Sequence, residues 1–135
     1  MFKYVRTMNG SATPPETVSI TVGSGQTIYE GGVYITTSSG QVEASLTSGM
    51  PKSIALEAKT SSEKTRDVKF LRVLPGMLFE TISNCQPEML CVGMHGTVES
   101  DNRGALGYFN EEGNDLEVIM HHYDPNPDLV IVTFI

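Results

Sequence analysis

The chain has 135 residues, of which 16 are acidic and nine are basic, and its formal net charge is −7. This length is sufficient for one domain with its own apolar core. The chain has no run of 18 apolar residues and no apolar stretch close to its N-terminus, so we expect neither a transmembrane helix nor a secretory signal.

Residues 1–15 are predicted to form an N-terminal arm. Phe2, Tyr4 and Val5 are interspersed with basic residues as in a short strand. The Pro14-Pro15 pair then favours an extended connection to the rest of the chain. The arm either folds back on its own domain or straps a neighbouring molecule, and the sequence leaves both possibilities open.

Residues 16–135 are predicted to form a single β-rich domain. Apolar alternation and turn residues predict strands at 17–22, 33–36, 41–44, 68–74, 97–99, 106–109, 116–123 and 129–135. Two shorter runs, Ile28-Tyr29 and Met89 to Val92, add to a total of about ten strands at the close spacing typical of all-β domains. We therefore expect an all-β fold, a small barrel or sandwich with at most one short helix.

Three of these segments carry further information. Ser53 to Ala58 fits a helical turn by propensity and a strand by its length. Val68 to Leu74 has apolar residues on both faces, which predicts an interior strand covered on two sides. Val130 to Ile135 is apolar almost throughout, so it must be paired in a sheet or buried against a partner.

The charges are unevenly distributed along the chain. Glu80 to Ile135 contains ten acidic residues and one basic residue, which gives −9, and Lys52 to Arg72 contains six basic and three acidic residues, which gives +3. The basic loop from Lys59 to Lys69 is predicted to be exposed, either as a solvated surface or as a contact between copies. Basic and aromatic residues are not interleaved, so we expect no nucleic-acid binding.

The most chemically suggestive group is His121-His122-Tyr123-Asp124. Adjacent strand residues point to opposite faces, so His121 and His122 cannot readily bind one ion together. His122 and Asp124 can share a face, and His95 could complete a zinc-like set. Ordinary half-buried side chains are the simpler interpretation.

Other catalytic and cofactor motifs are missing from the sequence. There is no nucleophile elbow and no phosphate-binding loop, so we expect no catalytic residues, no cofactor and no enzymatic activity. Cys85 and Cys91 lack the C-x-x-C spacing of zinc or redox sites. We expect free buried thiols, although a disulfide is possible if the loop between them brings the Cα atoms within about 7 Å.

About half of the chain resembles the head-decoration, or cement, proteins of tailed bacteriophages. The likeness lies in the order of the elements: a Gly-led strand, a small turn, a Pro-preceded apolar segment, a polar loop, and a strand that runs into a Pro-Gly corner. The matching segments are Glu30 to Tyr34, Gly40 to Glu43, Gly49 to Pro51, Ile54 to Glu57, Val68 to Val73 and Pro75 to Glu80. The longer C-terminal half and the two cysteines depart from the lambda-type pattern.

The resemblance implies a small β-tulip-like fold with an N-terminal arm and no enzymatic activity. It implies a protein made in the host cytoplasm and added to the capsid surface of a virion, with the major capsid protein and further copies of itself, as a homotrimer, as partners. It implies neither a membrane nor a nucleic-acid partner. The residues expected to make the contacts are Phe2, Tyr4 and Val5 in the arm and Phe134 and Ile135 between subunits. The alternatives are another virion β-module, such as a tail or head-completion protein, and a small metal-dependent enzyme using His95, His122 and Asp124.

Overall fold

The computed structural model describes residues 1–8, 15–36, 42–44, 51–83, 92–98, 106–110, 118–124 and 129–135. These residues form eleven strands and no helix, which confirms the all-β prediction. Within the described ranges, no helix is available that could cross a membrane. Cys85, Cys91 and all but the last residue of the predicted 89–92 run lie outside these ranges.

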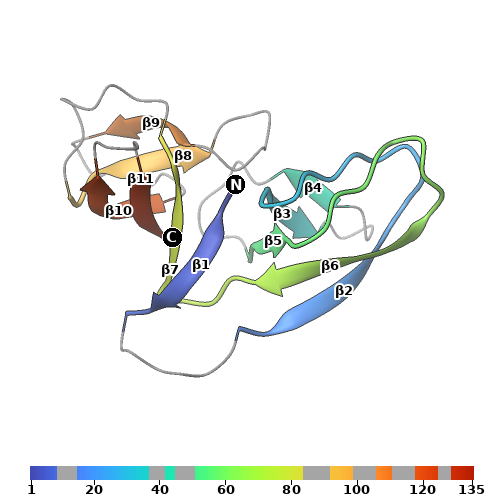
Figure 1. The fold of residues 1–135 in the computed structure, drawn as a ribbon, viewed down its shortest axis with the longest axis horizontal. Coiled ribbons are helices and arrows are strands. Elements are labelled where there is room, and N and C mark those ends of the chain that lie inside the picture. The colour runs from blue at the N-terminus through green and yellow to red at the C-terminus, as the bar shows by residue number, and fades with distance from the viewer. Residues whose placement is uncertain are drawn as a thin grey trace.

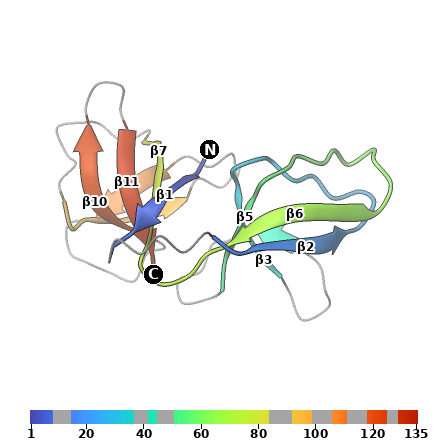
Figure 2. The same cartoon turned by 60° about the horizontal axis from the view of Figure 1, so that its bottom comes forward.

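The strands form two antiparallel sheets (Figures 1 and 2). The first sheet contains, in spatial order, β1 (Lys3–Thr7), β7 (Met77–Ile82), β11 (Leu129–Phe134), β10 (Val118–Asp124), β8 (His95–Val98) and β9 (Leu106–Asn110). The second contains β2 (Thr17–Val22), β6 (Arg66–Arg72), β5 (Ser53–Ala55), β3 (Val33–Thr36) and β4 (Val42–Ala44). Neither sheet closes on itself in the described residues, so the fold is a pair of open sheets and the barrel alternative is wrong.

Each sheet is associated with its own apolar core, and the first core extends across both sheets. It joins side chains of β7, β8, β10 and β11 with Val33, Ile54 and Leu71 of the second sheet. The second core lies within the second sheet and contains Val22, Ile28, Tyr34, Val42, Ala55, Val68 and Phe70. Burying each large side chain of this kind stabilises the fold by about 1.5–3 kcal/mol.

The strand β6 connects the two cores. It lies between β2 and β5, which confirms the predicted interior strand. Val68 and Phe70 point into the second core, whereas Leu71 belongs to the first. The alternation of a strand therefore places apolar side chains of β6 in both cores. Ser53–Ala55 is a strand and forms no helical turn.

The N-terminal residues fold back on their own domain as an edge strand. β1 pairs with β7, and a bulge interrupts the pairing between Tyr4 and Arg6. The Phe2 main-chain N–H donates a hydrogen bond of 3.0 Å to the Gly31 oxygen. Gly31 has φ of +78°, and a Cβ at this position would overlap Met1, so a glycine lets the N-terminus approach the second sheet.

Phe2 and the C-terminal strand meet in the first core. Phe2 is only 3% exposed, and its ring lies 5.1 Å from that of Phe134. β11 is paired on both sides, with β7 and β10, so the main chain of the apolar C-terminal segment finds its hydrogen-bond partners within its own sheet. The Phe2 ring is thus buried within its own chain, and the contact with a neighbour expected of Phe2 stays a prediction.

We expect Phe2→Ala to lower the free energy of unfolding by about 3–5 kcal/mol, because it removes a buried ring and leaves a cavity. Val5→Ala, in the strand that directly follows Phe2 but at a position that is 40% exposed, should change it by less than about 0.5 kcal/mol. Urea unfolding followed by circular dichroism measures both values. Two equally small effects would show that the N-terminal strand does not belong to the core.

Candidate functional site

An apolar surface depression lies where the chain crosses from the second sheet to the first. The crossing runs from Val73 to Gly76, and Gly76 has φ of +85°, a conformation that glycine adopts without strain. A hollow of about 360 Å³ lies beside it, which we call the hinge hollow. Its lining consists of Pro51, Lys52, Val73, Leu74, Pro75, Phe134 and Ile135. Leu74 is 43% exposed, so an apolar side chain stands at the rim in contact with water.

Lys52 holds the C-terminal end of the chain against this hollow. Its side chain is buried, and its Nζ donates a hydrogen bond of 3.2 Å to the main-chain oxygen of Ile135. The Val73 N–H donates to the Lys52 oxygen at 3.0 Å, which ties the crossing to the same residue. One buried lysine, directly before β5, thus contacts the residue that follows β11 and joins the ends of two strands from different sheets.

A second hollow of about 620 Å³ adjoins the hinge hollow and shares Pro51, Lys52, Val73 and Leu74 with it. We call it the β2 hollow, because Val18, Ser19 and Ile20 of β2 form part of its wall. Arg72 of β6 also lines it. The two hollows form a continuous, mainly apolar depression along the junction of the sheets.

The residues predicted to make intersubunit contacts occupy different environments. Tyr4 packs its ring 5.9 Å from that of Phe79, and Phe134 packs between Phe79 and Phe2. Val5 is exposed at the bulge. Ile135 lines the hinge hollow and is half-buried. Of the predicted set, Phe134 and Ile135 are therefore brought together at the hollow.

Pro51 and Leu74, which form much of the hinge hollow, were not predicted as contact residues. The one feature of the sequence that could have indicated this site is a leucine directly before the Pro75-Gly76 turn, where a polar residue is more usual. Periodicity placed Leu74 at the end of a strand and gave no reason to separate it from the core. Its exposure depends on how the two sheets meet.

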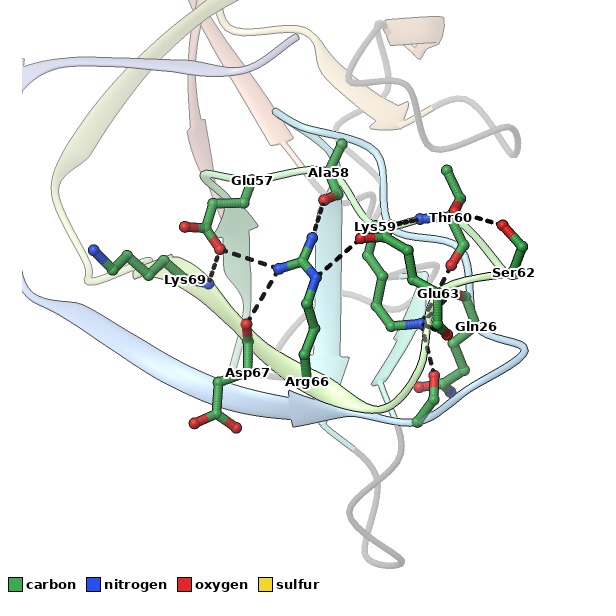
Figure 3. Close-up of polar contacts among 11 residues, drawn as sticks. Gln26, Glu57, Ala58, Lys59, Thr60, Ser62, Glu63, Arg66, Asp67 and Lys69 are labelled. Carbon is green, nitrogen blue, oxygen red and sulfur yellow. Dashed lines mark hydrogen bonds and ion pairs between the residues drawn. The ribbon is translucent and has the colours of Figure 1, made fainter.

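The basic loop of the second sheet is organised around a buried lysine (Figure 3). Lys59 is 1% exposed, which corrects the prediction that the loop from Lys59 to Lys69 is wholly exposed. Its Nζ donates to four main-chain oxygens, those of Gly23 at 3.0 Å, Gln26 at 3.2 Å, Thr60 at 3.3 Å and Glu63 at 3.3 Å. These oxygens compensate the ammonium group for its lost hydration, so a charge can be buried here.

Arg66 of the same loop is paired within the molecule (Figure 3). Its guanidinium group lies 3.2 Å from a Glu63 oxygen and 3.5 Å from a Glu57 oxygen, and its Nη2 donates to the Ala58 oxygen at 2.6 Å. The Glu57 carboxylate also accepts the Lys69 main-chain N–H at 3.1 Å. Two carboxylates thus neutralise the charge of Arg66 locally, which reduces the charge that this residue can offer to a partner.

The candidate metal ligands do not come together. His95 lies in β8, opposite Asn110 and Ile119, whereas His122 and Asp124 lie in β10, opposite Ile131 and Leu129. No group of three His, Cys, Asp or Glu side chains in the described residues is arranged to hold a metal ion. The zinc-like set of His95, His122 and Asp124 is therefore not assembled.

Comparisons with protein-family models, with curated proteins and with solved structures gave no significant match. The resemblance to phage decoration proteins therefore rests on the sequence segments quoted above.

Removing the buried ammonium group should destabilise the loop and the second core beneath it. We expect Lys59→Met to lower the free energy of unfolding by about 2 kcal/mol or more, because four main-chain oxygens lose a charged donor. Lys64→Met, at an exposed position of the same loop, should change it by less than about 0.5 kcal/mol. Thermal and urea unfolding of the two variants check the prediction, and equal effects would contradict it.

The pKa of the Glu63 carboxyl lies below its usual value of 4.5, chiefly because it accepts the Thr60 main-chain N–H and also because Arg66 lies beside it, while burial opposes the shift. A carboxylate with a lowered pKa stabilises the folded state above the unfolded-state value. This contribution is lost as the pH falls from about 4.5 through the folded-state pKa. We therefore expect the wild type to be more stable than Glu63→Gln at neutral pH, and the difference to vanish in acid.

Melting temperatures of the two proteins at low salt, measured from pH 7 down to about pH 2, test this dependence. A difference that stays constant across that range would mean that the carboxylate charge is not involved.

Proposed function

We propose that this chain is a capsid decoration protein that binds the outer surface of a tailed-phage head. It stabilises the shell by bridging neighbouring major capsid subunits, so that opening the shell also breaks the contacts of the bridge. The observation that carries the proposal is the hinge hollow, an apolar depression with an exposed leucine at its rim. The resemblance of about half the sequence to such proteins supplies the partner.

The features of the hinge hollow favour binding over catalysis. Among the described residues, its lining contains one ionisable side chain, Lys52, which already donates to Ile135. General acid–base or nucleophilic chemistry requires at least two suitably placed polar groups, and the described part of the lining does not supply them. A concave surface rich in proline and aliphatic side chains is suited to an apolar protrusion of another protein.

The N-terminal strand contributes to this proposal indirectly. Lys3 and Arg6 are exposed along β1, and a bulge interrupts the strand. Exposed charges and bulges both discourage the edge of a sheet from pairing with another molecule. Deleting residues 1–15 would also remove Phe2 from the first core, so the loss of attachment could not be separated from unfolding. We therefore propose that the hinge hollow, and not the arm, makes the capsid contact.

A charge placed at the rim of the hinge hollow should prevent binding without disturbing the fold. We expect Leu74→Asp to weaken attachment to expanded, empty phage heads by at least tenfold, because burial of an unpaired carboxylate at an interface is unfavourable. Ile82→Asp is the matched control, since Ile82 is 48% exposed on β7 and does not line either hollow. Cosedimentation of protein with heads, followed by quantitative gel analysis, measures the occupancy.

Reduced occupancy for Leu74→Asp alone supports the proposal. Wild-type protein that does not sediment with the heads overturns it, and so does equal binding by the wild type and Leu74→Asp.

A further inference from the structure

The outer strand of the second sheet, β2, lacks the protection found on β1. It runs for six residues, Thr17 to Val22, without a charged residue, a glycine or a proline. All six residues pair with β6 in an uninterrupted register, and β2 is the terminal strand of its sheet (Figure 1). A regular, uncharged edge of β-branched residues is a template for pairing with another strand. No described strand occupies its other side.

The hydrogen-bond pattern identifies the groups that face this open side. The Arg72 N–H donates to the Glu16 oxygen, which fixes the phase of the β2–β6 ladder. Because bonded and non-bonded pairs alternate in an antiparallel ladder, Val18, Ile20 and Val22 bond to β6. The Lys69 N–H agrees with this phase, since it turns away from Ser19 and donates to Glu57. The main-chain groups of Thr17, Ser19 and Thr21 therefore point outward.

We propose that two copies of the chain associate by antiparallel pairing of β2 with β2, with Ser19 on the two-fold axis. In this register Thr17 of each copy bonds to Thr21 of the other, and the two Ser19 residues bond to each other. Hydroxyl side chains then lie opposite hydroxyl side chains on one face. On the other face Val18 lies opposite Ile20, so β2 is complementary to itself from Thr17 to Thr21. The two five-stranded sheets become one continuous sheet.

The distribution of charge favours a second copy of the chain as the molecule that pairs with β2. The second sheet and its loops, from Glu16 to Leu74, contain six acidic and six basic residues and are neutral overall. The segment from Pro75 to Ile135 carries ten acidic residues and one basic residue. Two copies of this acidic protein can therefore approach through their second sheets with the least repulsion. Pairing through β2 brings together these two sheets of zero net charge and does not involve the acidic segments.

The pairing predicts two-fold symmetry. Self-pairing of a single edge uses the same strand in both copies, so it closes at two and cannot form the homotrimer that the resemblance implies. It also does not depend on the proposed function, because it requires no capsid partner. Its failure and the failure of capsid binding are measured in separate experiments.

Ser19→Glu tests the pairing at the axis. Within one copy, Glu at position 19 lies opposite Lys69 of β6 and forms a favourable cross-strand pair, so the fold is retained. In the pair, the two new carboxylates face each other across the axis with Cα atoms about 5.5 Å apart, and like charges directly opposite are destabilising. Ser61→Glu adds the same charge at an exposed turn outside the paired strand and is the matched control.

Sedimentation equilibrium gives the number of copies. We expect the wild type and Ser61→Glu to reach twice the chain mass of 14.7 kDa with increasing concentration. Ser19→Glu should remain at the single-chain mass, or dissociate at least ten times more readily, while its circular dichroism stays unchanged. Its melting temperature should equal that of the wild type at concentrations where the wild type is a monomer. In the wild type, hydrogen exchange at the amides of Thr17, Ser19 and Thr21 should slow as the concentration rises.

Three results would overturn the pairing. They are a wild type that is monomeric at every concentration up to its solubility limit, a wild type with three times the chain mass, and a dimer that Ser19→Glu leaves unchanged.

Discussion

The aromatic contact around Phe79 is the interaction on which the rest of the structure depends. Phe79 is completely buried in β7, with Tyr4 on one side and Phe134 on the other. Phe134 in turn contacts Phe2, so strands from the two ends of the chain pack on one central strand. Rings at these separations attract one another beyond their burial. This cluster positions Ile135 next to Lys52 and thereby forms the wall of the hinge hollow.

The sequence predicted features that depend on the local pattern and missed those that depend on distant partners. Apolar residues on both faces of Val68 to Leu74 correctly indicated an interior strand, because alternation reports directly on how many faces are covered. The burial of Lys59 was missed, since its four oxygen partners come from two separate loops. A lysine in a polar loop looks the same in the sequence whether it is buried or exposed. The hinge hollow was missed for a similar reason, because strand patterns do not predict how two sheets meet.

β1 and β2, which are terminal strands of different sheets, show that edges of one molecule can differ in their protection. Exposed Lys3 and Arg6 and a bulge protect β1. β2 has none of these features, although it is longer and more regular. The difference correlates with the charge of the two sheets. The protected strand β1 belongs to the sheet that contains the acidic segment, and the unprotected strand β2 belongs to the sheet whose net charge is zero. An unprotected edge of this kind would cause open-ended aggregation unless its pairing closed, and two-fold self-pairing closes it.

The paired edge and the hinge hollow would also act together. The β2 hollow shares part of its wall with the hinge hollow and is also lined by Val18 and Ile20, two residues of the strand that pairs in a β2–β2 dimer. A pair of copies therefore carries two hinge hollows at a separation fixed by a continuous sheet. A bridging protein needs at least two attachment points, and linking two weak sites on a rigid support raises the overall affinity without any new contact. Self-pairing through β2 would thus supply the second attachment point that a single hinge hollow lacks.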